Sequence, residues 1–146
     1  MDFDLTEQQR LMVDSVDHFF RQHFPPEEVR RRDRAHQPPD DLSPAMADAG
    51  FLGLPVPRRY GGLEQDWATV VLVHEHIAYH AGMVSSLFSR AVCFGAMSLL
   101  TYGSKRHREE LLPRIVRGEL LFSLGLTESG AQGGRRLAHQ RAQDVD

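Results

Sequence analysis

The sequence predicts an all-α protein of about five or six helices. Apolar residues recur at helical spacing in three long stretches, near residues 6–24, 67–80 and 83–102. Polar capping residues precede these stretches, and glycine or proline follows them. Neither an internal repeat nor a linker divides the chain, so these helices are expected to share one core.

The first helix has a clear start and a clear stop. Thr6 is a suitable N-cap, and Gln9 three residues later completes a capping box. Apolar residues then recur at helical spacing up to Pro25-Pro26, where the missing N–H groups end the helix. The sequence therefore predicts one amphipathic helix before the first proline pair.

Two shorter helices are expected next. The segment 27–35 is charged on nearly every face, and its Arg30–Arg34 run is read as a solvated surface in preference to a phosphate site. Ser43 followed by Pro44 has the pattern of an N-cap with proline at the first helical position. Gly50 closes this third helix.

The middle of the chain predicts a buried connection and then a central helix. The apolar segment 51–57 is expected to be extended and buried, and Tyr60–Gly62 forms a tight turn. Asp66 can cap a helix over 67–80, which is apolar on more than one face. A helix of that kind lies at the centre of a domain.

The last third predicts two more helices and an extended segment. A long apolar helix covers 83–102, and Ser104 caps another over 105–112. Pro113 is expected to begin a separate short turn because proline disrupts a helix interior. Residues 120–124 are then expected to be extended.

Composition excludes several classes of protein. With 146 residues, 41% of them hydrophobic and 25% charged, the chain resembles a single soluble globular domain. Its net charge of -3 argues against a general nucleic-acid binder. The acidic N-terminus lacks the pattern of a signal peptide, and no apolar run is expected to span a membrane. One cysteine cannot form an internal disulfide, so the expected location is the cytoplasm.

A metal site is a weak possibility. His76 and His80 are four residues apart and could share a helix face with metal-ligand spacing. The chain lacks the His-Glu-x-x-His order of zinc proteases, and neither His74 nor another residue is an obvious third ligand. These histidines are therefore expected to be hydrogen-bonded or surface residues.

Two further features carry little chemistry by themselves. Cys93 lies in an apolar helix, where a cysteine acts as a small hydrophobic residue unless a base lowers its pKa. Gly130, Gly133 and Gly134 could cradle a phosphate, but the Lys-Ser/Thr pair of a P-loop is missing.

Several short motifs occur together in a specific order. They are Leu5-Thr6-Glu7-Gln8-Gln9, Gly50-Phe51-Leu52-Gly53-Leu54, Arg59-Tyr60-Gly61-Gly62-Leu63, Tyr102-Gly103-Ser104, Leu111-Leu112-Pro113-Arg114-Ile115-Val116-Arg117-Gly118-Glu119 and Leu126-Thr127-Glu128. In this order they resemble the N-terminal domain of acyl-CoA dehydrogenases, from the first residues to about residue 131. The resemblance implies an orthogonal helical bundle over 1–131. It also implies that the polar tail 132–146 is the start of a β-domain whose remainder is missing.

The resemblance implies a flavoprotein oxidoreductase of fatty acid metabolism. Enzymes of this family use FAD to remove hydrogens from the α- and β-carbons of an acyl-CoA thioester, with a glutamate as base. By position, Leu124, Leu126 and Thr127 are expected beside the flavin ring, where backbone N–H groups and a hydroxyl can tune its electron affinity. The simpler alternative is that Thr127 only ends a strand.

The same resemblance assigns a substrate-facing side to the long helix 83–102. Leu87, Arg90, Ala91 and Phe94 are expected to face the acyl chain. Their spacing suits a plain core helix equally well. Arg90 would be costly in an apolar pocket without a partner, so an inward position predicts that the ligand or partner carries a carboxylate or another acceptor.

Two departures from the family pattern affect the expected activity. Ser129 replaces a proline, and Gln132-Gly133-Gly134 stands where Gly-Ser-Asp is expected. These changes put acyl-CoA binding in doubt, and Glu128 belongs to the structural signature and is not the catalytic base. This chain alone is therefore expected neither to retain FAD nor to act as an enzyme.

Three hypotheses about its role remain open. It is part of a dehydrogenase completed by another chain, a non-catalytic helical module that binds a homologous subunit, or a truncated remnant. The expected partners are a second copy or a complementing acyl-CoA dehydrogenase subunit, with an acyl-CoA-like thioester as ligand in the family context.

Overall fold

The computed structural model describes residues 4–125, and this part of the chain contains helices and loops but no β-strand. The α-helices are α1 (Glu7–His23), α2 (Pro26–Arg34), α3 (Ser43–Asp48), α4 (Trp67–His80), α5 (Gly82–Ser89), α6 (Ser98–Tyr102) and α7 (Lys105–Val116). Short 3₁₀ turns lie at Asp40–Leu42, Phe51–Gly53 and Arg58–Tyr60, and a π-helical segment, Arg90–Met97, joins α5 to α6. The all-α prediction is confirmed.

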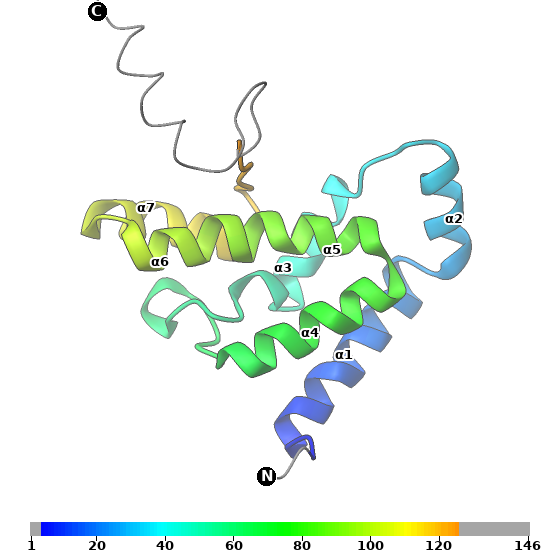
Figure 1. The fold of residues 1–146 in the computed structure, drawn as a ribbon, viewed down its shortest axis with the longest axis horizontal. Helices are drawn as coiled ribbons and strands as arrows, with labels where there is room; N and C mark the ends of the chain where they lie inside the picture. Colours follow the sequence, from blue (N-terminus) through cyan, green and yellow to red (C-terminus); the bar gives the residue numbers. More distant parts are fainter. Residues whose placement is uncertain (1–3, 126–146) are drawn as a thin grey trace, which may run out of the picture.

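One long helix organises the domain (Figure 1). It runs from Gly82 to Tyr102 over 21 residues and consists of α5, the π-helical segment and α6. We call it the central helix. On one side α4 packs against α5, and α1 packs against α4. On the other side α7 runs beside the π-helical segment and α6, so the central helix lies between α4 and α7 (Figure 1).

The core draws on every part of the described chain. Its largest fully buried aromatic side chains are Phe24, Phe51 and Phe88. Around them pack apolar residues from α1, α3, the loop 51–57, α4, the central helix and α7: Val16, Met46, Leu52, Leu54, Val56, Val73, Ile77, Val84, Leu87, Val92, Leu112 and Ile115. Burial of this apolar surface is the main force that holds the helices together.

The central helix is long and apolar enough to cross a membrane, judged by length and composition alone. The expectation that no run reaches this length is therefore wrong. Within the domain 44% of its most apolar 18-residue window is buried, and a core helix passes the same test. Its apolar character is accounted for by its position between α4 and α7.

The predicted helix starts are confirmed at three positions. Thr6 and Gln9 form the capping box, with the Gln9 N–H 3.2 Å from the Thr6 hydroxyl and the Thr6 N–H 3.0 Å from Gln9 Oε1. The Asp66 carboxylate accepts the Thr69 N–H at 2.9 Å and begins α4. Ser104 caps α7 in the same way. These side chains satisfy backbone donors that a helix leaves unpaired at its start.

The segment 51–57 is buried as predicted but is not extended. It starts with the 3₁₀ turn Phe51–Gly53, which follows Gly50 in a left-handed conformation with φ of 80°. The next part of the chain folds back over it, because the N–H groups of Leu63 and Gln65 bond the carbonyls of Gly53 and Leu54. The apolar run is therefore a compact loop, and a run of buried residues does not distinguish a loop from a strand.

Two predicted helix ends are corrected. Ser43 is the first residue of α3 and not its cap, because its hydroxyl donates to the carbonyl of Gly118 at 2.9 Å. Pro113 lies inside α7, which continues to Val116. Its ring removes one backbone hydrogen bond near the end of the helix, while burial of Leu112 and Ile115 on either side holds the last turn in place.

The arginine-rich face of α2 is not entirely solvated. Arg32 is buried, and its guanidinium donates to both carboxylate oxygens of Asp41 and to Glu28. It also lies over the ring of Phe24, 5.1 Å from the centroid. Arg32 therefore ties α2 to the turn before α3. We call Arg32, Glu28 and Asp41 the α2 clamp.

Candidate functional site

The π-helical segment gives the central helix an unusual surface. Its turns are wider than those of an α-helix, because each N–H bonds the carbonyl five residues earlier. Ala91, Val92, Gly95 and Ala96 face the core, whereas Phe94 is half-buried and Met97 is 44% exposed. Such segments occur frequently at functional sites. The apolar spacing over 83–102 predicts an ordinary α-helix here, so the π-helical geometry is a feature that the sequence pattern does not reveal.

The segment Leu120–Gly125 lies against this surface. The N–H of Phe122 bonds the carbonyl of Arg90 at 3.3 Å. Leu120, Leu121 and Phe122 pack against the core, whereas Leu124 is 58% exposed. The segment follows α7 and rises from the central helix where the described chain ends (Figure 1). Residues 120–124, which the sequence predicts to be extended, form neither a helix nor a strand.

Phe122 sits directly on Gly95. A methyl group on the Gly95 Cα would lie 2.8 Å from Phe122 Cδ2 and 3.0 Å from Ile115 Cδ1. Both distances are shorter than ordinary contacts between carbon atoms, which lie near 3.5–4.0 Å. The sequence offered one signal for this contact, since an isolated glycine in an apolar helix often marks close packing.

Arg90 has a partner within the domain. Its Nη1 lies 2.8 Å from Asp40 Oδ1, with 31% of the Arg90 side chain exposed. The carboxylate that pairs with Arg90 therefore comes from the domain itself, whereas the sequence predicts it on a ligand or partner. Since the Arg90 carbonyl also accepts the Phe122 N–H, this residue joins the turn before α3 to the segment after α7.

The four residues predicted to face an acyl chain occupy different environments. Leu87 and Ala91 are almost fully buried in the core of the domain, whereas Arg90 and Phe94 are half-buried. The change from α- to π-helical geometry falls between Ser89 and Arg90 and shifts the faces that simple spacing predicts. Contact of any of the four with an acyl chain stays a prediction.

Of the three residues predicted beside a flavin, only Leu124 lies in the described chain. Leu126 and Thr127 fall outside the described residues, as do the glycines at 130, 133 and 134. Leu124 is exposed, and the N–H groups of 123–125 have no backbone acceptor within residues 4–125. This short piece of backbone can therefore offer donors to a bound molecule.

The histidines of α4 make hydrogen bonds within the domain. His74 Nε2 lies 2.8 Å from the Ser85 hydroxyl, and the His76 ring bonds the carbonyl of Leu72. His80 pairs with Asp17 of α1 at 2.7 Å. Within residues 4–125, three potential metal ligands do not come together at any point. The hydrogen-bonded reading of these histidines is confirmed.

Cys93 lies in the π-helical segment and is half-buried. Desolvation raises the pKa of its thiol above the usual value. A raised pKa keeps the sulfur protonated near neutral pH and argues against a nucleophile.

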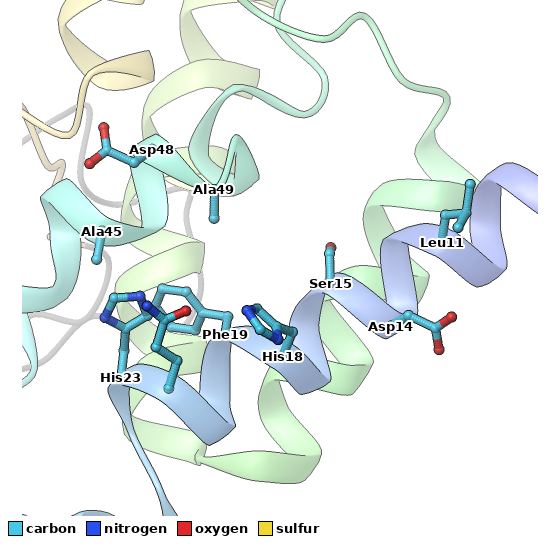
Figure 2. Close-up of a pocket in the computed structure, with 10 residues that line it drawn as sticks. Leu11, Asp14, Ser15, His18, Phe19, His23, Ala45, Asp48 and Ala49 are labelled. Carbon is cyan, nitrogen blue, oxygen red and sulfur yellow. The ribbon is translucent and has the colours of Figure 1, made fainter.

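A separate groove lies between α1 and α3, away from the central helix. Its volume is about 570 Å³. Figure 2 shows Leu11 at one end and Ala45 near the other, with Phe19 and His18 between them. The Asp14 and Asp48 carboxylates add polar groups to a largely apolar lining. It contains none of the residues singled out from the sequence as a candidate site.

Comparison with known proteins identifies the domain. Residues 6–119 match the family model described as "Acyl-CoA dehydrogenase, N-terminal domain". The chain is 28% identical to the glutaryl-CoA dehydrogenase of Desulfococcus multivorans, covering 90% of this chain and 34% of that protein. It is 31% identical to the probable acyl-CoA dehydrogenase YdiO of Escherichia coli K12, with the same two coverages.

A solved structure supports the same identification. Butyryl-CoA dehydrogenase from Megasphaera elsdenii superposes with a TM-score of 0.80 at 26% identity, covering 90% of this chain and 35% of that one. The chain thus spans about a third of the length of the relatives it matches. The ordered motifs, the helical fold and the family match agree. The chain belongs to the acyl-CoA dehydrogenase family, and residues 6–119 form its N-terminal domain.

Proposed function

We propose that this chain supplies the N-terminal domain of an FAD-dependent enzyme that dehydrogenates acyl-CoA thioesters between the α- and β-carbons. The observation that carries the proposal is the position of Leu120–Gly125 on the π-helical segment, within a domain of this family. Leu124, Leu126 and Thr127 then contact the flavin, and the nearby surface of the central helix contacts the acyl chain.

The described part of the flavin-facing segment fits this role. Leu124 presents an exposed apolar side chain, and the neighbouring N–H groups have no backbone acceptor within residues 4–125. A flat heteroaromatic ring can stack on the former and accept hydrogen bonds from the latter. FAD, when bound, supplies the oxidising power, and these residues orient it and adjust its electron affinity.

On the substrate side, Phe94 and Arg90 are the best placed of the predicted residues, because both are partly accessible. Phe94 offers an apolar surface to an acyl chain. Asp40 balances the charge of Arg90, so its guanidinium does not leave an unpaired cation beside that surface. Leu87 and Ala91 support the same face from within the core.

A chimeric enzyme tests the proposed function. We expect butyryl-CoA dehydrogenase from Megasphaera elsdenii, with its matching N-terminal third replaced by residues 1–131 of this chain, to retain FAD and oxidise an acyl-CoA. In that chimera Thr127→Val removes one hydroxyl and a hydrogen bond worth about 1 kcal/mol, which should shift the flavin reduction potential. A folded chimera that binds no flavin would contradict the proposal.

By itself, the 146-residue chain should not retain FAD. The residues assigned to the flavin form a single short segment, and one segment cannot enclose a dinucleotide. We expect the purified chain to lack a stoichiometric flavin absorbance band and to leave added FAD fluorescence unchanged. A one-to-one flavin complex of this chain would show that the site is more complete than proposed.

Exposed apolar side chains on the central helix and on the segment after α7 point to a protein partner. Leu124 and Met97 are 58% and 44% exposed, and Tyr102 is 88% exposed. We propose that a second copy or a complementing dehydrogenase subunit covers them, since burial of apolar area contributes about 25 cal/mol per Å².

Light scattering over a concentration series tests this partner. Met97→Glu and Leu124→Glu should each reduce self-association, because a carboxylate is costly to bury in an apolar contact. Leu11→Glu, at an equally exposed leucine on α1, is the matched control. A wild-type chain that stays monomeric at all concentrations would argue against the second copy.

A further inference from the structure

We propose that Gly95 is a positioning residue: its missing side chain sets where Phe122 lies, and thereby where Leu124, the flavin-facing residue of the described chain, is held. The expected effect on the flavin rests on the proposed function, whereas the contact between Gly95 and Phe122 can be tested in the chain alone. It concerns a residue that contacts neither flavin nor substrate.

The first argument is steric. Any β-carbon at position 95 would lie 2.8 Å from Phe122 Cδ2 and 3.0 Å from Ile115 Cδ1. Gly95 is buried, and its neighbour Ile115 is 0% exposed, so neither of these two residues has open space to move into. Phe122 is only partly buried, and it lies on a segment outside any helix. With alanine at 95, the segment carrying Phe122 is the element that must move.

The second argument is that Phe122 is also fixed by its backbone. Its N–H bonds the carbonyl of Arg90, and Arg90 is itself held by Asp40. The ring contact and the hydrogen bond both lie on the π-helical segment, five residues apart. Together the ring contact and the hydrogen bond fix where the segment leaves the central helix and in which direction it runs.

Phe122 is close to the flavin-facing residues along the chain. Leu124 follows it by two residues, so a shift of Phe122 is carried to Leu124. A misplacement of about 1 Å in a positioned group can reduce the rate of a reaction about a hundredfold. Gly95 therefore acts through Phe122 on a site that it does not touch.

Hydrogen exchange of the wild-type chain and its variants tests the contact. In Gly95→Ala, we expect the Phe122 amide to exchange at least about tenfold faster, while the amide of Val73 in α4 keeps its rate. Gly82→Ala is the matched control, because Gly82 is exposed on the same helix and has no other atom within 4 Å of an added methyl group. It should leave the Phe122 amide unchanged.

A double variant separates positioning from a general loss of packing. If the Gly95 methyl group acts by displacing the Phe122 ring, shortening that side chain should relieve it. In a Phe122→Leu background, adding Gly95→Ala should accelerate amide exchange at position 122 by less than about threefold. Equal acceleration in both backgrounds, or acceleration at Val73 as well, would overturn the proposal.

The chimera links the contact to the cofactor. Gly95→Ala should weaken FAD binding to the chimera about tenfold or more, whereas Gly82→Ala should not. If the chimera without substitutions fails to bind FAD, the proposed function fails, and exchange in the chain still tests the contact. If exchange changes as expected but FAD affinity does not, the segment is positioned by Gly95 without serving the flavin.

Discussion

Replacing Gly62 with alanine is expected to destabilise the domain strongly. A methyl group on its Cα would lie 2.0 Å from the carbonyl oxygen of Val56 and 2.5 Å from its carbonyl carbon. That oxygen accepts the Glu64 N–H at 3.0 Å, and Val56 is completely buried. Backbone atoms cannot rotate away as a side chain does, so the loop over 51–65 must separate. We expect a loss of about 3 kcal/mol or more in the free energy of unfolding.

Urea denaturation followed by circular dichroism measures this loss. Gly125→Ala is the matched control, since Gly125 also lies in a loop and has no atom within 4 Å of an added methyl group. The control should unfold at the wild-type urea concentration. A Gly62→Ala protein with wild-type stability would mean that the turn at 61–63 can rearrange without disturbing Val56.

The helices were predictable from sequence because their signals are local. Thr6 with Gln9, and Asp66 before α4, place polar caps directly at the helix starts, and the structure contains both. The predictions are wrong where the local structure depends on a residue far away in the sequence. Ser43 was assigned as a cap, but its hydroxyl bonds the carbonyl of Gly118, 75 residues away in the chain. The spacing of residues in the sequence does not reveal that Ser43 and Gly118 lie side by side in the fold.

The candidate site was predictable only in outline. The resemblance pointed to the central helix and to the segment after α7, and the structure brings these two together through Phe122 and Arg90. The π-helical geometry was missed because the sequence 90–97 satisfies an α-helical pattern equally well. Asp40 was also missed as the partner of Arg90, since the two are 50 residues apart.

A different kind of error concerns Arg32. Its neighbours Arg31 and Arg34 are exposed, and a run of charged residues is usually solvated. Arg32 is buried because Glu28 one turn earlier and Asp41 in the next element both accept hydrogen bonds from its guanidinium. The long side chain also covers Phe24, so the arginine replaces an apolar residue on this face.

The second large effect is expected from this α2 clamp. Arg32→Met keeps the length and the apolar stem of the side chain but removes the guanidinium, leaving Asp41 without its cation and Glu28 paired only with Arg31. We expect a loss of about 2 kcal/mol in the free energy of unfolding. The loss stays below that for a fully buried pair because 57% of the Asp41 side chain is exposed. Arg30→Met, at an exposed arginine on the same helix, should have little effect.

The clamp should also be visible in the pH dependence of stability. Hydrogen bonds from Arg31 and Arg32 lower the pKa of Glu28 from 4.5 to about 2, and Arg32 lowers the pKa of Asp41 below its usual 3.8. A carboxyl group with a lowered pKa in the folded state stabilises the fold above its usual pKa. That contribution is lost as pH falls through the folded-state pKa. The wild-type protein should therefore lose stability between about pH 4.5 and pH 2.

The stability of Arg32→Met should depend less on pH over the same pH range. Without the guanidinium of Arg32, Asp41 loses the main cause of its lowered pKa, and Glu28 keeps only Arg31. The difference in unfolding free energy between wild type and Arg32→Met should be largest above pH 5 and should shrink toward pH 2. Urea denaturation at pH 6, 4 and 2.5 measures that difference. A difference that stays constant across this range would show that Arg32 stabilises the fold through its packing on Phe24 and not through its charge.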